Sequence, residues 1–304
     1  MTGFLQGKNV VVTGGGGGIG RAVALRCAAE GANVVVADYG VAMDGSSPSS
    51  DVANAVVKEI EAEGGTAIAI AGDVSQFEVG AEIVNTCVEA WGSIDGAVCV
   101  AGNLRERMLF NMSEEEWDAV IDVHLKGHFN IYRHASAVMR KQETGGSLVA
   151  FISAAFVGST AQANYSSAKG GITSLSRSTA LALHRYGVRS NCIAPSARTR
   201  MSENVPFEIE AGTPESIAPM AVYLLSDRSK DITGQIYTVI GPRIAVWNQP
   251  AELRSMFAPE GADEWTPEGI AEWLPKTIKV EEHPMLADLA RREAQRLAKE
   301  QAGG

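Results

Sequence analysis

The chain has 304 residues, of which 45% are hydrophobic, so it can bury a substantial core in one large domain or two small ones. A formal net charge of -10 argues against anionic partners, namely nucleic acids and acidic membrane surfaces. We find no signal peptide, no C-terminal peroxisomal signal and no apolar run near the roughly 18 residues of a membrane span, and we therefore expect a cytoplasmic protein.

The four cysteines do not form a pattern of their own. Cys27, Cys87, Cys99 and Cys192 lie far apart in apolar surroundings and include no CxxC pair. We expect buried free thiols rather than disulfides, and no metal site.

Short apolar segments alternate with helical segments as far as residue 240. The apolar segments are rich in Val, Ile and Ala on both faces, as is typical of buried parallel strands. Expected strands are 8–13, 33–38, 66–71, 95–100, 147–152, 188–193 and 235–240. Expected helices are 18–30, 51–63, 75–90, 113–140, 164–186 and 214–226. This alternation predicts an α/β fold with a doubly wound parallel sheet in a single domain, residues 1–240, whose ligands bind at the carboxyl ends of the strands.

Three of the expected helices carry start signals. Ser75 with Glu78, and Ser113 with Glu116, have the spacing of capping boxes. Thr213 followed by Pro214 places an N-cap before a proline at the first helical position.

The remaining segments are irregular. Residues 39–50 are small and polar and predict a long loop after the second strand. Residues 241–304 form a C-terminal extension with three tryptophans, Trp247, Trp265 and Trp273, and we expect it to pack on the domain or on a partner subunit. Within it, the sequence of 284–300 predicts a helix that starts at Pro284 and lies either on the surface or against a partner.

The stretch TGGGGGIG, Thr13–Gly20, lies between the first strand and the first helix. Gly14 lets the turn close, Gly18 lets the backbone approach a pyrophosphate, and Gly20 lets the helix lie close to the sheet. The first amides of the helix then face the phosphates. A floppy linker would not sit between a buried strand and a helix, so we predict a Rossmann-type dinucleotide site.

Two acidic residues follow expected strands. Asp38 can accept hydrogen bonds from both ribose hydroxyls of an adenosine and would repel a 2′-phosphate, which favours NAD over NADP. Asp73 and Val74 end the third strand, where the adenine should lie. For each aspartate the alternative is a side chain that only caps a turn.

Tyr165 and Lys169 are four residues apart, so a helix puts their phenol and ammonium groups on one face. A nearby ammonium lowers the pKa of a phenol, and a phenol tuned in this way can exchange a proton with an alcohol. Ser153 ends the fifth strand and can converge with them at the carboxyl edge of the sheet. The alternatives are a solvated Tyr–Lys pair and an ordinary strand-end serine.

Residues 5–240 resemble the short-chain dehydrogenase/reductase family. The segments that carry the resemblance are Thr13–Gly20, Asp73-Val74, Ala101-Gly102, Ser153, YSSAK (Tyr165–Lys169), NCIAP (Asn191–Pro195) and ITGQ (Ile232–Gln235). The resemblance implies that Tyr165 is the general acid/base, that Lys169 binds the nicotinamide ribose and lowers the Tyr165 pKa, and that Ser153 orients the substrate oxygen. It also implies cofactor contacts from the glycine turn, with Gly14, Gly18, Ile19 and Gly20, and from Asp38, Asp73, Val74, Ala101, Gly102, Tyr165 and Lys169.

A narrower resemblance covers residues 104–129, 158–172 and 193–201. These segments are similar to the (3R)-hydroxyacyl-CoA dehydrogenase part of peroxisomal multifunctional enzymes and to actinobacterial stand-alone relatives. The long loop after Asp38 and the extension beyond 240 fit that subgroup as well.

Three positions depart from the family pattern. The usual NNAG segment reads Cys99-Val100-Ala101-Gly102, so both asparagines are absent. His124 replaces the helical asparagine that completes a proton relay, either as a variant relay residue or as a plain buried histidine. Ser153 lies twelve residues before Tyr165, one fewer than usual in the family, which leaves its placement open.

Two classes of function follow. The first is an NAD-dependent oxidoreductase that interconverts a secondary alcohol and a ketone, with either a 3-hydroxyacyl thioester or a steroid or other hydrophobic alcohol as substrate. The second is a cofactor-binding scaffold or regulatory protein that has lost efficient catalysis. Arg198 and Arg200, in the segment 195–212 that should cover the substrate, either meet a phosphate-bearing group such as CoA or cap the following helix.

We also expect a homodimer or homotetramer. The small residues of the expected helix 164–186 let a second helix approach closely, and 113–140 adds apolar residues to the same surface. These residues are Ala168, Gly171, Thr173, Ser174, Ser178, Ala182, Val120, Val123 and Phe129. The alternative is that they pack on the chain's own sheet.

Overall fold

The computed structural model describes residues 3–40, 49–198, 211–250, 252, 254–258, 264–278, 286, 291, 293–295 and 298. It divides into two units, Met1–Asn248 and Gln249–Gly304. The first unit runs past residue 240 because the final strand pairs with the strand before it. The second unit contains α8 (Pro267–Thr277), whose first turn is capped by Thr266.

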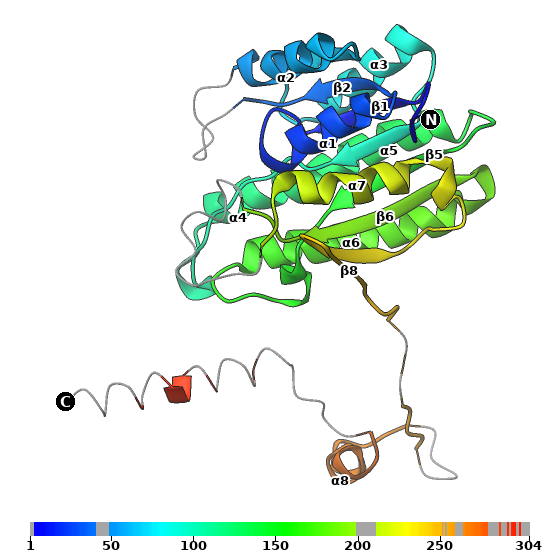
Figure 1. Ribbon diagram of the computed structural model, residues 1–304. Coiled ribbons are helices and arrows are strands. Elements are labelled where there is room, and N and C mark those ends of the chain that lie inside the picture. The colour runs from blue at the N-terminus through cyan, green and yellow to red at the C-terminus, as the bar shows by residue number, and fades with distance from the viewer. Residues whose placement is uncertain are drawn as a thin grey trace. The chain divides into compact units, whose positions relative to one another are not determined.

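The first unit is built on one eight-stranded sheet (Figure 1). Its strands are β1 (Asn9–Thr13), β2 (Asn33–Ala37), β3 (Thr66–Ile70), β4 (Gly96–Cys99), β5 (Gly146–Phe151), β6 (Val188–Pro195), β7 (Ile236–Ile240) and β8 (Arg243–Val246). The order is β3-β2-β1-β4-β5-β6-β7-β8, and all pairs are parallel except β7 with β8. The strand order reverses between β1 and β4, which is where an open parallel sheet binds its ligand.

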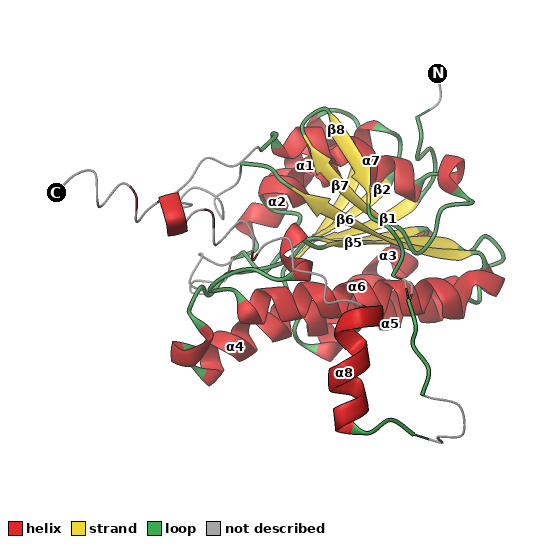
Figure 2. Ribbon diagram, turned by 90° about the horizontal axis from the view of Figure 1, so that it is seen from below, coloured by secondary structure: helices red, strands yellow, loops and turns green. Residues whose placement is uncertain are grey.

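Helices cover both faces of the sheet (Figure 2). One layer is α1 (Gly18–Ala29), α2 (Asp51–Ala62) and α7 (Pro214–Leu225), and the other is α3 (Phe77–Trp91), α5 (Gly127–Met139) and α6 (Ala163–Leu183). The short helix α4 (Glu114–Ile121) packs against α6. The predicted doubly wound α/β fold is therefore confirmed.

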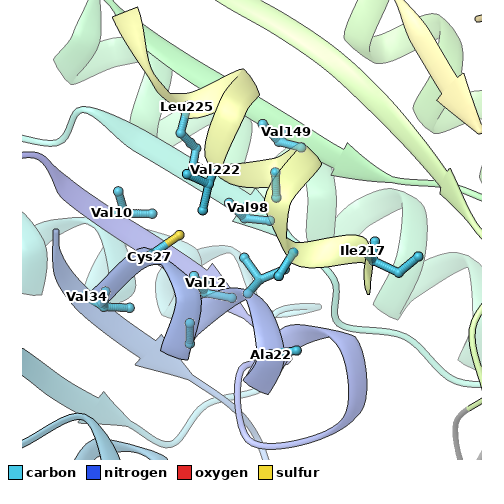
Figure 3. Close-up of a cluster of buried hydrophobic side chains, with 14 of the residues drawn as sticks. Val10, Val12, Ala22, Cys27, Val34, Val98, Val149, Ile217, Val222 and Leu225 are labelled. Carbon is cyan, nitrogen blue, oxygen red and sulfur yellow. The ribbon is translucent and has the colours of Figure 1, made fainter. Parts of the chain in front are cut away.

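The two layers follow from the strand sequences, which are apolar on both faces. All five residues of β1 are buried, with Val10 and Val12 in one hydrophobic cluster and Val11 in the other. Side chains alternate across a strand, so each face needs its own helical layer. Figure 3 shows Val10 and Val12 gathered with Cys27 of α1 and Val222 of α7. The four cysteines are free and buried, as expected.

Two capping predictions are confirmed and one is wrong. Ser113 and Glu116 form the reciprocal box at the start of α4, and Thr213 accepts from the Ser216 amide at the start of α7. Ser75 and Glu78 do not form a box, because α3 starts at Phe77 with Gln76 at its N-cap. The Ser75 amide instead donates to Asp73 Oδ1 at 2.9 Å, which closes a turn before the helix.

The expected helix 113–140 is not continuous. A π-helical turn, η2 (Asp122–Lys126), joins α4 to α5 and brings His124 to the inner side of this helical segment. π turns of this kind are rare and frequently occur at functional sites. The antiparallel strand β8 was not predicted either, since its alternate residues Ile244 and Val246 are exposed.

Several predictions lie at least partly outside the described residues. They concern most of the loop 39–50, most of the segment 195–212 including Arg200, and most of the helix 284–300. Among the helices that the structure describes, none combines the length and apolar character needed to cross a bilayer.

Candidate active site

The glycine turn is packed so tightly that side chains are excluded. Gly14 has φ of 67°, and a Cβ there would lie 2.7 Å from the Ala101 amide nitrogen at the end of β4. A Cβ on Gly20 would lie 1.9 Å from the Gly14 carbonyl oxygen. Both contacts are to backbone, which cannot move aside. Ala101 and the glycine turn therefore meet at the carboxyl edge, beside the point where the strand order reverses.

Helix α1 starts at Gly18, whose φ of 48° is also left-handed. No side chain of the described residues caps this first turn, so its amides are left for a ligand. The side chain of Ile19 packs against the hydrophobic core and so fixes the position of the glycine turn. A cradle of backbone N–H groups at a helix N-terminus, too narrow for any Cβ, suits a pyrophosphate.

Asp38 directly follows β2 and lies against the glycine turn. Its Oδ2 accepts from the Gly16 amide at 2.8 Å and its Oδ1 accepts from the Gly40 amide at 2.7 Å. The carboxylate therefore caps two turns, as the alternative reading had it. The same two contacts hold its negative charge at the edge of the cradle.

Asp73 and Val74 lie between β3 and α3. The Asp73 carboxylate accepts the Ser75 amide, so its side chain serves the turn, as the alternative reading had it. Val74 is buried, and its carbonyl accepts from Asn130 Nδ2 at 2.8 Å. This contact fixes the segment to α5.

Tyr165 and Lys169 lie one turn apart on α6, and Lys169 Nζ is 5.4 Å from the centre of the Tyr165 ring. Lys169 is buried and donates to the Phe151 carbonyl at the end of β5, at 2.7 Å. Ser153 follows two residues later, and its hydroxyl lies near enough to the Tyr165 phenol to lower the pKa of Tyr165. The structure thus brings Ser153, Tyr165 and Lys169 together despite the shortened spacing.

The Ser153 hydroxyl is oriented by its own turn. Its Oγ accepts from the Ala155 amide at 3.2 Å, at the start of the 3₁₀ turn η3 (Ala154–Val157). Because this oxygen accepts from the backbone, its proton is available to donate to the phenol. Such a bond favours the phenolate and lowers the pKa of Tyr165.

The electrostatics differ from the expectation that Lys169 lowers the Tyr165 pKa. Burial raises the pKa of Tyr165 to about 12, and the hydrogen bond from Ser153 only partly offsets it. Burial lowers the pKa of Lys169 to about 7, while Cys192 and Cys99 oppose this shift. The Lys169 ammonium donates its hydrogen bond to the Phe151 carbonyl and not to the Tyr165 phenol. It therefore lowers the pKa of Tyr165 less than the sequence spacing suggested.

His124, on the π turn, packs edge-to-face on Tyr165, with ring centres 5.2 Å apart. Its Nε2 lies 2.8 Å from the Asn103 carbonyl oxygen and 3.1 Å from the Asn103 amide nitrogen. Its Nδ1 is buried and has no hydrogen-bond partner among the described residues. Burial, reinforced by the nearby Lys169 charge, holds the His124 pKa well below its usual range, so the ring is neutral.

Gly102 and His124 are matched to each other. A Cβ on Gly102 would lie 2.2 Å from His124 Cε1. Gly102 ends the segment that replaces the family's usual NNAG. Because it has no side chain, it leaves room for the imidazole of His124, which stands where the family has an asparagine. In the same segment, Cys99 is buried and pairs with Thr13 across the sheet.

Sequence reasoning missed two residues that hold this site. Asn164, fully buried beside Tyr165, donates to the carbonyls of Arg105 (3.0 Å) and Glu116 (2.9 Å) and accepts from the Tyr165 amide. Asn103 binds His124 and donates to the Ala119 carbonyl. A signal for Asn164 was available, since asparagine is a poor helix former and its place next to Tyr165 suggests a bonding role.

We predict that Gly102→Ala lowers both stability and turnover, because the new methyl group displaces the His124 ring. Overpacking of this kind costs about 1–3 kcal/mol, measurable by urea denaturation. The matched control is the double variant Gly102→Ala/His124→Ala, in which the clash is removed. Gly102→Ala should therefore cost less stability in the His124→Ala background than in the wild type, and an equal cost in both backgrounds would show that the two residues are not matched.

The comparisons with known proteins agree with this geometry. A family model described as enoyl-(acyl carrier protein) reductase matches residues 14–241. The chain is 41% identical over 273 residues to hydroxyacyl-CoA dehydrogenase ChsB1 of Mycobacterium tuberculosis, covering 84% of each chain. It is 39% identical over 231 residues to mouse peroxisomal multifunctional enzyme type 2, covering 75% of this chain and 31% of that enzyme.

A solved structure is similar over nearly its full length. The crystal structure of a short chain dehydrogenase from Mycobacterium avium superposes with a TM-score of 0.82 at 42% identity, covering 93% of this chain and 98% of that one. The family model, the relatives and the shared fold lead to one conclusion: the chain belongs to the short-chain dehydrogenase/reductase family of oxidoreductases.

Proposed function

We propose that the protein is an NAD-dependent dehydrogenase that interconverts a 3-hydroxyacyl thioester and its 3-oxo form. The observation that carries the catalytic part is the convergence of Ser153, Tyr165 and Lys169 beside the glycine cradle. The thioester rests on similarity to ChsB1, whose name states hydroxyacyl-CoA dehydrogenase activity, and to the multifunctional enzymes. The steroid alternative has no matching observation.

In the oxidative direction, bound NAD would supply the hydride acceptor for the hydrogen on the carbinol carbon. Tyr165 Oη takes the hydroxyl proton of the same substrate, so the alcohol loses one hydride and one proton and becomes a ketone. We assign the Ser153 hydroxyl, which lies near the Tyr165 phenol, the role of orienting the substrate oxygen. Lys169, with a pKa of about 7, can release or take up a proton near neutrality.

His124 extends this path in our assignment. Its neutral ring touches Tyr165, and its buried Nδ1 has an unused lone pair or proton among the described residues. A neutral imidazole can hold a water or pass a proton between its two nitrogens. We therefore assign His124 the relay role rather than that of an inert core residue.

Asp38 supports NAD over NADP. Its carboxylate sits at the glycine turn with an oxygen 2.8 Å from the Gly16 amide. A 2′-phosphate placed there would meet a fixed negative charge, whereas ribose hydroxyls would find acceptors. Asp73 and Val74 would then flank the adenine, with Ala101 and Gly102 beside the cofactor.

We predict that Tyr165→Phe abolishes turnover of a 3-hydroxyacyl-CoA while NADH still binds. Only the proton-transferring oxygen is lost, and a positioned acid/base contributes at least about 100-fold. Turnover is followed by reduced-nicotinamide absorbance and binding by NADH fluorescence. Lys169→Ala should weaken both.

Two outcomes would contradict the proposal. A Tyr165→Phe variant that keeps a tenth of the wild-type rate would show that the phenol is not the acid/base. Wild-type protein that binds NADH but turns over no member of a panel of secondary alcohols would favour the scaffold reading.

We predict that the wild-type protein binds NADH more tightly than NADPH, and that Asp38→Ser combined with Tyr39→Arg shifts preference toward NADPH. The double change removes a repelling charge and adds a cation able to bind the phosphate. Titration of both cofactors by fluorescence measures the ratio. Asp38→Asn is the matched control, since it removes the charge without adding a cation, and tighter NADPH binding by the wild type would refute the assignment.

We further propose that the protein assembles as a two-fold dimer, or a dimer of dimers, through α5 and α6. Ser174, Ser178 and Ala182 are exposed along α6, and Leu181 beside them is 83% exposed. Phe129 on α5 is 45% exposed. Ala168, Thr173 and Val120, which the sequence analysis also assigned to this face, are buried within the chain itself, so the surface is narrower than expected.

We predict a dimer or tetramer at micromolar concentration in analytical ultracentrifugation, and a shift toward monomer in Leu181→Glu. In a two-fold dimer, a glutamate at position 181 is repeated on the partner subunit, and the two like charges repel each other across the interface. Ile244→Glu is the matched control, because it places the same charge on the exposed edge strand β8. It would shift the assembly only if a tetramer used that edge. A wild-type monomer would sink the assembly proposal.

A further inference from the structure

Trp247 directly follows β8 and lies beyond residues 14–241, which the family model matches. Its amide donates to the Ile236 carbonyl at 3.0 Å, and its indole Nε1 donates to the Thr238 hydroxyl at 2.8 Å. Both partners belong to β7. The indole is therefore fixed to the sheet at two points, one through its backbone and one through its side chain.

The indole of Trp247 packs on the aromatic ring of Phe156. Phe156 lies edge-to-face with Trp247, with ring centres 4.8 Å apart and an interplanar angle of 73°. Both side chains pack against the hydrophobic cluster between the sheet and α5–α6. An edge-to-face pair of this kind contributes about 0.5–1.5 kcal/mol beyond the area that it buries, which is enough to select one position of a short turn.

Phe156 belongs to η3, the turn that carries the Ser153 hydroxyl. The Phe156 amide donates to the Ser153 carbonyl at 3.0 Å, and the Ala155 amide donates to Ser153 Oγ. The Gly158 amide closes the turn on the Ala155 carbonyl at 2.9 Å. In so short a turn, a displacement of the Phe156 ring moves the Ser153 hydroxyl with it.

We propose that Trp247 is a positioning residue for catalysis: by holding Phe156, it fixes the Ser153 hydroxyl against the Tyr165 phenol. The inference rests on the proposed function, because it needs Tyr165 as the acid/base. It gives the added antiparallel strand β8, which Trp247 follows, a role in the chemistry.

Three groups face the Tyr165 side chain: Ser153 from η3, Lys169 from α6 and His124 from the π turn. Of these, only Ser153 lies on the turn that Trp247 holds. Loss of the Trp247 contact therefore displaces the Ser153 hydroxyl, the group that lowers the Tyr165 pKa, and leaves the lysine and the histidine in place. A loosened core would instead disturb all three groups.

The experiment compares Ser153→Ala, Trp247→Ala and Phe156→Leu in the oxidation of a 3-hydroxyacyl-CoA at saturating NAD. Because Tyr165 works as a base in this direction, a higher pKa moves the rising limb of kcat/KM to higher pH. We expect all three variants to move it in that direction, by about one pH unit, the size of a hydrogen bond to a charged group. We expect kcat to fall about 10- to 100-fold, as for a misplaced catalytic group, with NADH affinity unchanged.

Phe156→Leu keeps most of the apolar volume and so remains informative where Trp247→Ala fails to fold. Ile244→Ala is the matched control on β8, since it removes a side chain that is 57% exposed, and it should behave as wild type. Adding Trp247→Ala to Ser153→Ala should produce little further shift of the pH profile, because both changes act on one hydrogen bond.

The possible failures are distinguishable. If Ser153→Ala leaves the pH profile in place, the assigned role of Ser153 in the proposed function is wrong. If Ser153→Ala shifts the profile but Trp247→Ala and Phe156→Leu do not, the inference about Trp247 is overturned. A fall in kcat for those two variants without a shift assigns Trp247 a purely structural role and also overturns it.

Discussion

The burial of both faces of the central strands is the constraint on which the structure depends. Val10, Val11 and Val12 alternate between two hydrophobic clusters, so neither face of β1 can be left to water. Each strand from β1 to β6 is therefore followed by a helix that packs on the sheet, and the neighbouring strands run parallel from β3 to β7. Their carboxyl ends then share one edge. The glycine turn, Asp38, Ala101 and Ser153 gather there because each lies one or two residues after the end of a strand, although more than 100 residues of sequence separate the first from the last.

The second constraint is the removal of Lys169 from water. A buried ammonium is unfavourable unless it is bonded, and Lys169 has one hydrogen bond, to the Phe151 carbonyl, so its pKa falls to about 7. The same environment raises the pKa of Tyr165 to about 12 and keeps His124 neutral. A lysine that exchanges protons near neutrality, beside a phenol that holds its proton, suits a site through which protons pass.

Short runs that are apolar on both faces, alternating with helical segments, together with the glycine turn, were sufficient to predict the parallel strands, the helical layers and the edge that carries the candidate site. They could not predict the π turn, because the apolar pattern around His124 is that of a continuous helix. They also missed the contact of Trp247 with Phe156, which joins residues 91 positions apart through side chains alone. The sign of the Tyr165 shift was wrong because i,i+4 spacing fixes a distance to Lys169 but not the burial that outweighs it.

The raised pKa of Tyr165 bears on how one site can work in both directions. With a pKa of about 12 the phenol is protonated at neutral pH, which is the form that donates a proton during ketone reduction. In the proposed function, oxidation needs the phenolate, and a positive charge near the phenol would stabilise it. An oxidised nicotinamide held by the glycine cradle would bring such a charge, and a reduced one would not. Ser153, which lowers the Tyr165 pKa, would then support the phenolate in oxidation, while burial keeps the proton on the phenol for reduction.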